Sequence, residues 1–154
     1  MYLSRQIQRG TPVGTPELRE ITMTTGSPAT GAVTKLSPRP VAGTVTRLTG
    51  LISGKGLKLF AVVDQSAEAR QVGMELRDTT LVIFGSPAAG TPVMAAAPLA
   101  ALDLPLKVLI WDDEGQTKVS YTAPATIAAR YGLTDDLTAR LAGIDPLTDA
   151  LVTS

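Results

Sequence analysis

The chain has 154 residues, which suits one domain with its own core, and its 14 basic and 14 acidic side chains give a formal net charge of zero. It contains no cysteine and no histidine, which excludes disulfides, thiolate zinc sites, cysteine nucleophiles and a Ser-His-Asp triad. Any catalysis would have to rest on carboxylates, lysine, tyrosine, serine or threonine. Because basic residues are not clustered and aromatic residues make up only 4%, we expect neither nucleic acid nor membrane binding.

The first 31 residues are rich in glycine, proline and threonine and show no sustained periodicity, so we interpret residues 1–31 as a flexible N-terminal extension. Met23 is a candidate alternative start, which would make residues 1–22 an artefact of gene assignment. No segment reaches the roughly 18 unbroken apolar residues of a membrane span. The N-terminus also lacks the apolar core of a signal peptide. We therefore expect a cytoplasmic protein with a single domain over residues 32–154.

Strands and helices alternate along that domain. Apolar residues at Val41, Val45, Leu48 and Ile52 follow the period of a helix after a first short strand at residues 32–37. The segments LPLKVLIWDD and QTKVSYTA, joined by a tight turn, predict a β-hairpin. The other predicted elements are strands at residues 57–64 and 77–84, helices at 67–73, 92–102 (with a break at Pro98), 124–133 and 134–143, and a last short helix after Pro146.

This order, β-α-β-α-β-α-β-β-α-α, predicts an α+β fold with a mixed, largely antiparallel sheet and helices packed on one face. The closing hairpin requires that at least part of the sheet is antiparallel. A doubly wound α/β fold is the alternative.

The stretch FGSPAAGTPVM resembles a phosphate-binding loop because Gly85 and Gly90 stand five residues apart between a strand and a helix. However, Thr91 occupies the position of the lysine that neutralises the phosphates, and Pro92 occupies the position of the magnesium-binding hydroxyl. Nucleotide hydrolysis is therefore excluded. The same residues form a turn if Thr91 caps a helix that begins at Pro92. The second interpretation is a loop whose amides and Ser86 hydroxyl hold a small ligand or anion.

Four segments together identify a resemblance to a known family: GLKLFAVVD, IFGSPAAGTPVM, PLAALDLPLKVLIW and VSYTAPATIAARYGL. Over about residues 54–133, and back to Ala32, the chain closely resembles the domain of unknown function 302 family. The resemblance implies a small α+β domain, usually a homodimer, with no established biochemical activity. One departure stands out, because members commonly carry a histidine where this chain has Gln65, between Asp64 and Ser66. If relatives use that imidazole for metal binding or proton transfer, this chain lacks it.

Two further polar residues are candidates. Asp64 follows a buried strand, where functional carboxylates are common, although it could instead help Ser66 to cap the next helix. Lys107 interrupts an apolar strand, which fits either a lysine beside a pocket or one on an open face or edge of the sheet.

We therefore expect an uncharacterised, homodimeric, non-enzymatic module that binds a small molecule or anion or acts as an accessory protein, without cofactor or metal. The alternative is an enzyme of unknown class that uses Asp64 as acid or base and Lys107 as electrostatic partner in a small pocket. A purely structural subunit without a pocket is a third possibility. The candidate binding residues are Asp64, Ser66, Gly85, Ser86, Gly90, Thr91 and Lys107.

Overall fold

A computed structural model describes residues 24–27 and 30–154, so Met23 and most of the predicted extension lie outside the described residues. The strands are β1 (Thr24–Ser27), β2 (Ala32–Leu36), β3 (Lys58–Asp64), β4 (Thr79–Gly85), β5 (Leu106–Asp113) and β6 (Gln116–Thr122). The helices are α1 (Val41–Gly54), α2 (Gln65–Gln71), α3 (Pro87–Ala96), the 3-10 helix η1 (Pro98–Leu102), α4 (Pro124–Tyr131), α5 (Asp135–Ala139) and α6 (Ile144–Val152). From β2 onward the order agrees with the predicted one, with α6 as the last short helix.

The strands form one sheet in the order β1-β2-β6-β5-β4-β3, and every described pair is antiparallel. The α+β prediction is confirmed, and the doubly wound alternative is wrong because that fold requires parallel neighbours. The predicted hairpin is β5–β6, with Asp113 paired to Gln116. β1 extends the sheet with residues that lie inside the predicted extension.

The central strands bury every second residue, so only one face of the sheet belongs to the core. The ladder pairs Val82 with Val108 and Ile110 with Val119, and each of these side chains is fully buried. The residues between them on the same strands are half-exposed and lie on the opposite face. Helices are therefore needed on one face only.

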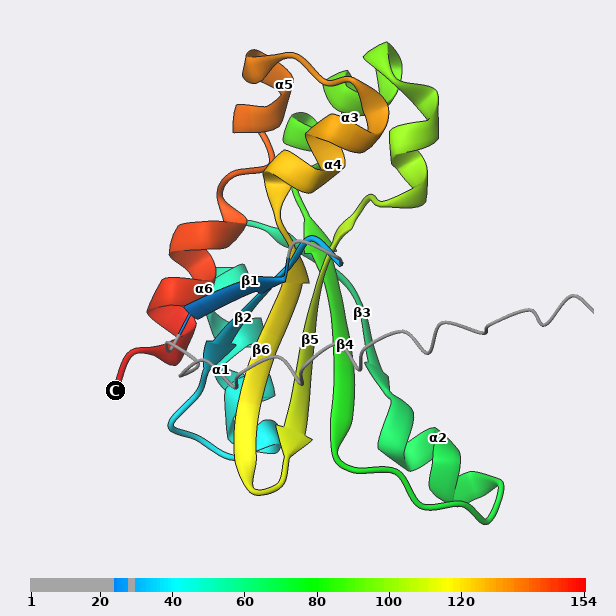
Figure 1. Cartoon of the computed structure of the whole chain (residues 1–154), viewed down its shortest axis with the longest axis vertical. Coiled ribbons are helices and arrows are strands. Elements are labelled where there is room, and N and C mark those ends of the chain that lie inside the picture. The colour runs from blue at the N-terminus through cyan, green and yellow to red at the C-terminus, as the bar shows by residue number, and fades with distance from the viewer. Residues whose placement is uncertain (1–23, 28–29) are drawn as a thin grey trace, which may run out of the picture.

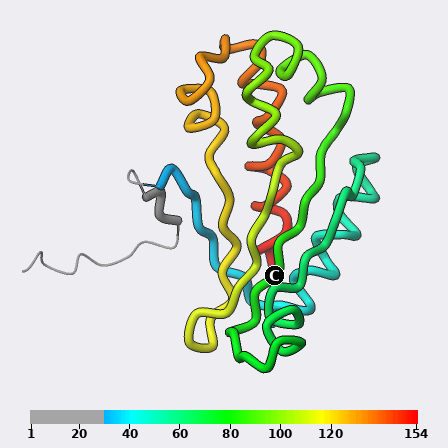
Figure 2. Tube along the Cα trace, turned by 90° about the vertical axis from the view of Figure 1, so that its right-hand side faces the viewer, coloured from blue at the N-terminus to red at the C-terminus, as the bar shows by residue number. Residues whose placement is uncertain are grey.

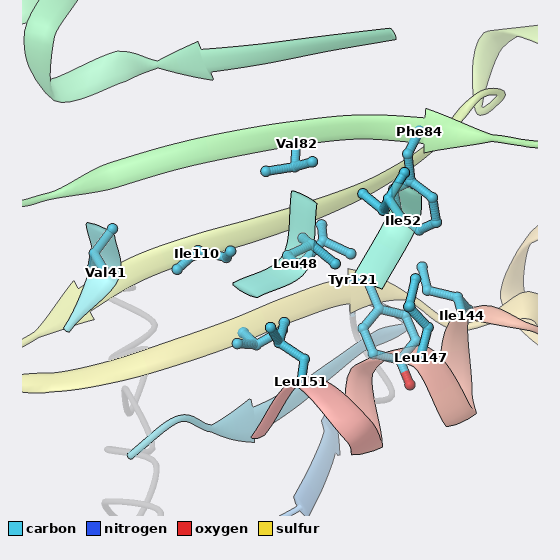
Figure 3. Close-up of a cluster of buried hydrophobic side chains, with 12 residues drawn as sticks. Val41, Leu48, Ile52, Val82, Phe84, Ile110, Tyr121, Ile144, Leu147 and Leu151 are labelled. Atoms are coloured by element: carbon cyan, nitrogen blue, oxygen red, sulfur yellow. The ribbon is translucent and has the colours of Figure 1, made fainter. Parts of the chain in front are cut away.

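Helices α1 and α6 cover that face. The apolar positions predicted for α1 include Leu48 and Ile52, which are buried against strand residues such as Phe84. Leu147 and Leu151 of α6 complete the same core (Figure 3). A surface helix with one apolar stripe gains most of its stability from this kind of packing.

The remaining helices lie beyond the ends of the strands. Helices α3, η1, α4 and α5 gather at one end, whereas α2 lies at the other (Figures 1 and 2). The first group encloses a second, smaller core built on Val93, Ala100, Ile127 and Leu141. Leu106 at the start of β5 packs against both cores. We call η1 and helices α3 to α5 the cap.

A buried lysine fastens α6 to the sheet. Lys35 of β2 is 7% exposed, and its Nζ donates to the Thr148 hydroxyl at 2.7 Å and pairs with the Asp149 carboxylate at 2.8 Å. Burial by itself lowers the pKa of Lys35, but the hydrogen bonds to Asp149 and Tyr121 outweigh it, so the pKa lies above its ordinary value. The Tyr121 hydroxyl in turn donates to Asp145 at 2.5 Å. Lys35 is therefore charged at neutral pH.

Replacing Lys35 tests how much its contacts with α6 contribute to stability. Lys35→Met keeps the apolar stem but removes the ammonium, so the free energy of unfolding in urea should fall by about 2–3 kcal/mol. The matched control is Lys55→Met at an exposed position after α1, where the change should stay within about 0.5 kcal/mol. Equal losses in the two variants would show that the Lys35 contacts add nothing to stability.

Candidate functional site

A cleft of about 260 Å³ lies where β4 leads into α3, between the sheet and the cap. Phe60, at a bulge in β3, forms part of its wall, and Arg140 stands at the end of α5. The remaining lining residues are Gly85, Ser86, Pro87, Ala89, Gly90, Thr91, Met94, Leu104, Pro105, Leu106 and Leu141. Four of the predicted binding residues, Gly85, Ser86, Gly90 and Thr91, therefore lie in one cleft.

The helix at this cleft begins five residues earlier than predicted. Ser86 is the N-cap, with an extended backbone and its hydroxyl accepting from the Ala89 amide at 3.3 Å, and Pro87 is the first helical residue. The prediction of Thr91 as the cap and Pro92 as the start was wrong, because Ser86-Pro87 supplies the same capping chemistry first. Thr91 and Pro92 lie inside α3. Gly90 is thus a helical residue rather than part of an open loop.

The start of α3 offers few groups to an anion. Pro87 has no amide hydrogen, and the amides of Ala89 and Gly90 both donate to the Ser86 carbonyl, at 3.0 and 2.8 Å. A phosphate-binding loop instead points several free amides at its ligand. The geometry agrees with the exclusion of nucleotide hydrolysis.

The cleft is mostly apolar, with polar groups at a few positions. Met94, Leu104 and Leu106 present hydrocarbon or thioether surface, and Phe60 is 44% exposed. Arg140 is the charged lining residue, and within residues 30–154 no ion pair engages its exposed guanidinium. An apolar wall with one cation suits a small apolar molecule that carries a negative group.

Asp64 and Ser66 lie elsewhere and have capping roles. Asp64, and not Ser66 as predicted, is the N-cap of α2: its Oδ1 accepts from the Ser66 hydroxyl at 2.7 Å and the Ala67 amide at 2.9 Å. These two bonds hold the pKa of Asp64 below its ordinary value. The Ser66 oxygen also accepts from the Thr79 amide at 3.3 Å. A carboxylate so stabilised is a weak proton acceptor.

These two residues line a second cleft, of about 270 Å³, beside the start of α1. The β3–β4 ladder pairs Asp64 with Thr80 and Lys58 with Gly85, so the two clefts lie at opposite ends of these strands. The two ends are five residues apart along β4, which corresponds to a distance of roughly 17 Å.

Lys107 projects from the uncovered face of β5, since its neighbour Val108 is buried on the other face. The structure agrees with the prediction that Lys107 lies on an open face of the sheet. The prediction of an edge position does not hold, because β5 is an interior strand. Its Nζ donates to the Pro105 carbonyl at 3.3 Å. It lines a cavity of about 40 Å³ that also includes Asp103, enough for about one water molecule. Asp64 and Lys107 therefore do not share a cavity.

Sequence inspection did not predict the polar cluster around Asp103. Its carboxylate accepts from the Tyr131 hydroxyl and from Arg130 Nη1 at 2.7 Å. Burial by itself raises the pKa of Asp103, but these two hydrogen bonds outweigh it and leave the pKa below its ordinary value. The contacts join η1 to α4 and so hold the cap together. Phe60 and Arg140 were missed as well, since a bulge and a remote helix bring them to the cleft.

Comparison with known proteins identifies the family and the fold of this chain. Residues 33–151 match the family described as "Domain of unknown function DUF302". A solved structure, the uncharacterized conserved protein DUF302 from Bacillus stearothermophilus, is similar with a TM-score of 0.67 and 16% identity, covering 79% of this chain and 94% of that one. This likeness concerns the fold.

Curated relatives add a partial match. A "Fluoride-specific ion channel FluC 1" of Brucella suis biovar 1 and a "Fluoride-specific ion channel FluC 2" of Brucella melitensis biotype 1 are each 38% identical over 79 residues, or 51% of this chain. The match spans 31% and 29% of those proteins, so it covers about a third of their length. None of the helices described here is both long and apolar enough to cross a membrane. The match over residues 33–151 shows that the chain belongs to the DUF302 family.

Proposed function

We propose that this protein is a non-enzymatic binding module, and that it takes a small apolar molecule with one anionic group into the cleft between the sheet and the cap. The observation that carries the proposal is the cleft itself, about 260 Å³ with an apolar wall and Arg140 as its charged residue. The homodimer that the family resemblance implies is part of the same proposal.

The size of the cleft limits the ligand. Pockets for drug-sized molecules run from roughly 300 Å³ upward, so this one suits a smaller compound. The hydrocarbon part would contact Met94 and Leu106, while Arg140 would pair with the anionic group and the Ser86 hydroxyl would donate a hydrogen bond to it. A medium-chain carboxylic acid such as octanoate has this chemistry.

The geometry gives less support to an enzyme built on Asp64 and Lys107. The two side chains line different cavities, and the hydrogen bonds to Asp64 favour its charged form and cap α2. A general base must reach the proton that it removes and must bind that proton with useful affinity. The position of Asp64 and its hydrogen bonds favour neither this reach nor this affinity.

A second candidate is an accessory role beside a fluoride channel. The observation that favours it is the 38% identity over 79 residues with the two Brucella proteins that carry this name. Because the match covers under a third of each relative, the role proposed for this chain is support of the channel rather than conduction.

Filling the cleft from inside tests the binding proposal. A Cβ at Gly90 meets only Met94 Cε, at 3.9 Å, and Gly90 lines the cleft, so we expect a larger side chain at this position to project into it. Gly90→Leu should reduce octanoate affinity, measured by calorimetry, at least about tenfold, a loss of roughly 1.4 kcal/mol. The control Gly90→Ala should retain binding and stabilise α3 by about 0.5–1 kcal/mol. Unchanged binding by the leucine variant would place the ligand elsewhere.

Arg140 should discriminate charged from neutral ligands. Arg140→Gln removes the cation at an exposed position, so octanoate affinity should fall about five- to tenfold, whereas octanol affinity should stay the same. Calorimetry with both compounds on both proteins measures the difference. Equal losses for the acid and the alcohol would mean that Arg140 shapes the wall and does not bind the charge.

The accessory role makes a cellular prediction. Deleting the gene in its own organism should lower the fluoride concentration that stops growth, since a channel without its accessory domain would export less. Sodium chloride at equal concentration controls for salt stress, and restoring the gene should restore tolerance. Identical fluoride tolerance with and without the gene would remove this candidate.

A further inference from the structure

Large apolar side chains are exposed mainly at one edge of the sheet. Among the described residues, six of the eight exposed large apolar side chains lie between Leu59 and Leu76. On β3 these are Leu59 at 42%, Phe60 at 44% and Val62 at 44% exposed. On the segment after α2 they are Val72 at 72%, Met74 at 65% and Leu76 at 46% exposed. A concentration of this kind marks an interaction surface.

The backbone of β3 points to the same conclusion. β3 is the last strand of the sheet and pairs with β4 alone, so within the described part of the chain its outer amides and carbonyls have no strand partner. An edge strand that is both exposed and apolar readily pairs with another strand, and proteins usually protect such an edge with charges, proline or a cover. Here the protective charges stand only at the two ends, Lys58 and Asp64.

Those two charges make the strand complementary to itself. In an antiparallel pair with the midpoints opposed, Lys58 of one strand faces Asp64 of the other, and this happens at both ends. Both of these hydrogen bonds of Asp64 are accepted by its Oδ1, so its Oδ2 takes part in neither of them. Ala61 lies at the centre, where a small side chain lets two backbones approach.

We propose that β3 is the homodimer interface, and that a second copy of this chain adds its own β3 antiparallel to it, which rests on the dimer proposed above. In this arrangement α2 of one copy, which follows Asp64, reaches the Lys58 end of the other. Helix α2 and the segment after it continue beyond the Asp64 end of β3 (Figure 1). The exposed Val72 and Met74 of one copy then lie toward the Lys58 end of the other copy's β3, where Leu59 and Phe60 are exposed.

A charge at the centre of β3 tests the interface. Val62→Asp places a carboxylate one residue from the two-fold axis in each copy, opposite Phe60 of the partner strand. A loss of about tenfold from each copy weakens the dimer about 100-fold. The matched control is Leu102→Asp on η1, which changes a side chain 74% exposed at the far end of the molecule and should leave the dimer intact. Light scattering after gel filtration across a dilution series measures the mass, and circular dichroism confirms that both variants fold.

Cysteine cross-linking provides a second measurement. The chain has no cysteine, so a single introduced thiol can form a disulfide only between two copies. Single cysteines at Ala61, Val62 and Val63 cover the registers near the axis, and at least one should oxidise to a covalent dimer, because paired strands hold Cα atoms within disulfide reach. The control Asp136→Cys on the exposed face of α5 should stay monomeric in denaturing gels.

The outcomes separate the interface from the other proposals. A wild-type protein that is monomeric at every dilution would overturn both the dimer and the interface. A dimer that survives Val62→Asp, or that gives no disulfide at any of the three positions, would overturn the interface alone. Phe60 belongs to both the cleft and the interface, so octanoate binding to the Val62→Asp variant tests the cleft in the absence of the dimer.

Discussion

The central strands β4, β5 and β6 can bury only one of their two faces, and most of the architecture follows from this constraint. Apolar side chains occupy every second position, so the face with Val82, Val108 and Val119 needs a cover. Helices α1 and α6 provide it, which explains why both carry a single apolar stripe. The Lys35 ammonium adds directed contacts to the packing of α6. A charge that is buried and fully paired also fixes the position of the helix along the strands.

The covered sheet leaves its ends as the places where side chains of several elements meet. The cleft beside Ser86 forms where a strand ends, a helix begins and the cap folds back over both. At the opposite end, Asp64 and Ser66 have similar local chemistry, yet their hydrogen bonds are directed to capping α2. The two turns differ in what surrounds them, since Arg140 at the end of α5 and the following Leu141 line only the first cleft. Neighbouring elements, more than the turn residues, decide what lines the cleft beside each turn.

Local patterns predicted the α+β class, the β5–β6 hairpin, the apolar stripe of α1 and the strand-to-helix setting of Ser86, because each depends on residues close in the chain. The start of α3 was predicted five residues late, since two Ser/Thr-Pro pairs compete as caps and the sequence does not rank them. The cap of α2 was assigned to Ser66 instead of Asp64, because both residue types cap helices and they stand only two positions apart. Phe60 could not be placed at the cleft, because a bulge in β3 changes the direction of its side chain. The separation of Asp64 from Lys107 follows from strand order, which no local pattern contains.

The division into two apolar cores has a consequence for the dynamics of the protein. The sheet core and the cap core meet at Leu106, which packs against both. Cooperative units of this kind can open separately, with the smaller one opening at a lower free energy than the whole domain. The cap amides would then exchange their hydrogens faster than those of β4, β5 and β6, while the sheet remains folded. A ligand held between the two cores would slow that opening, so its binding energy would appear as protection of the cap.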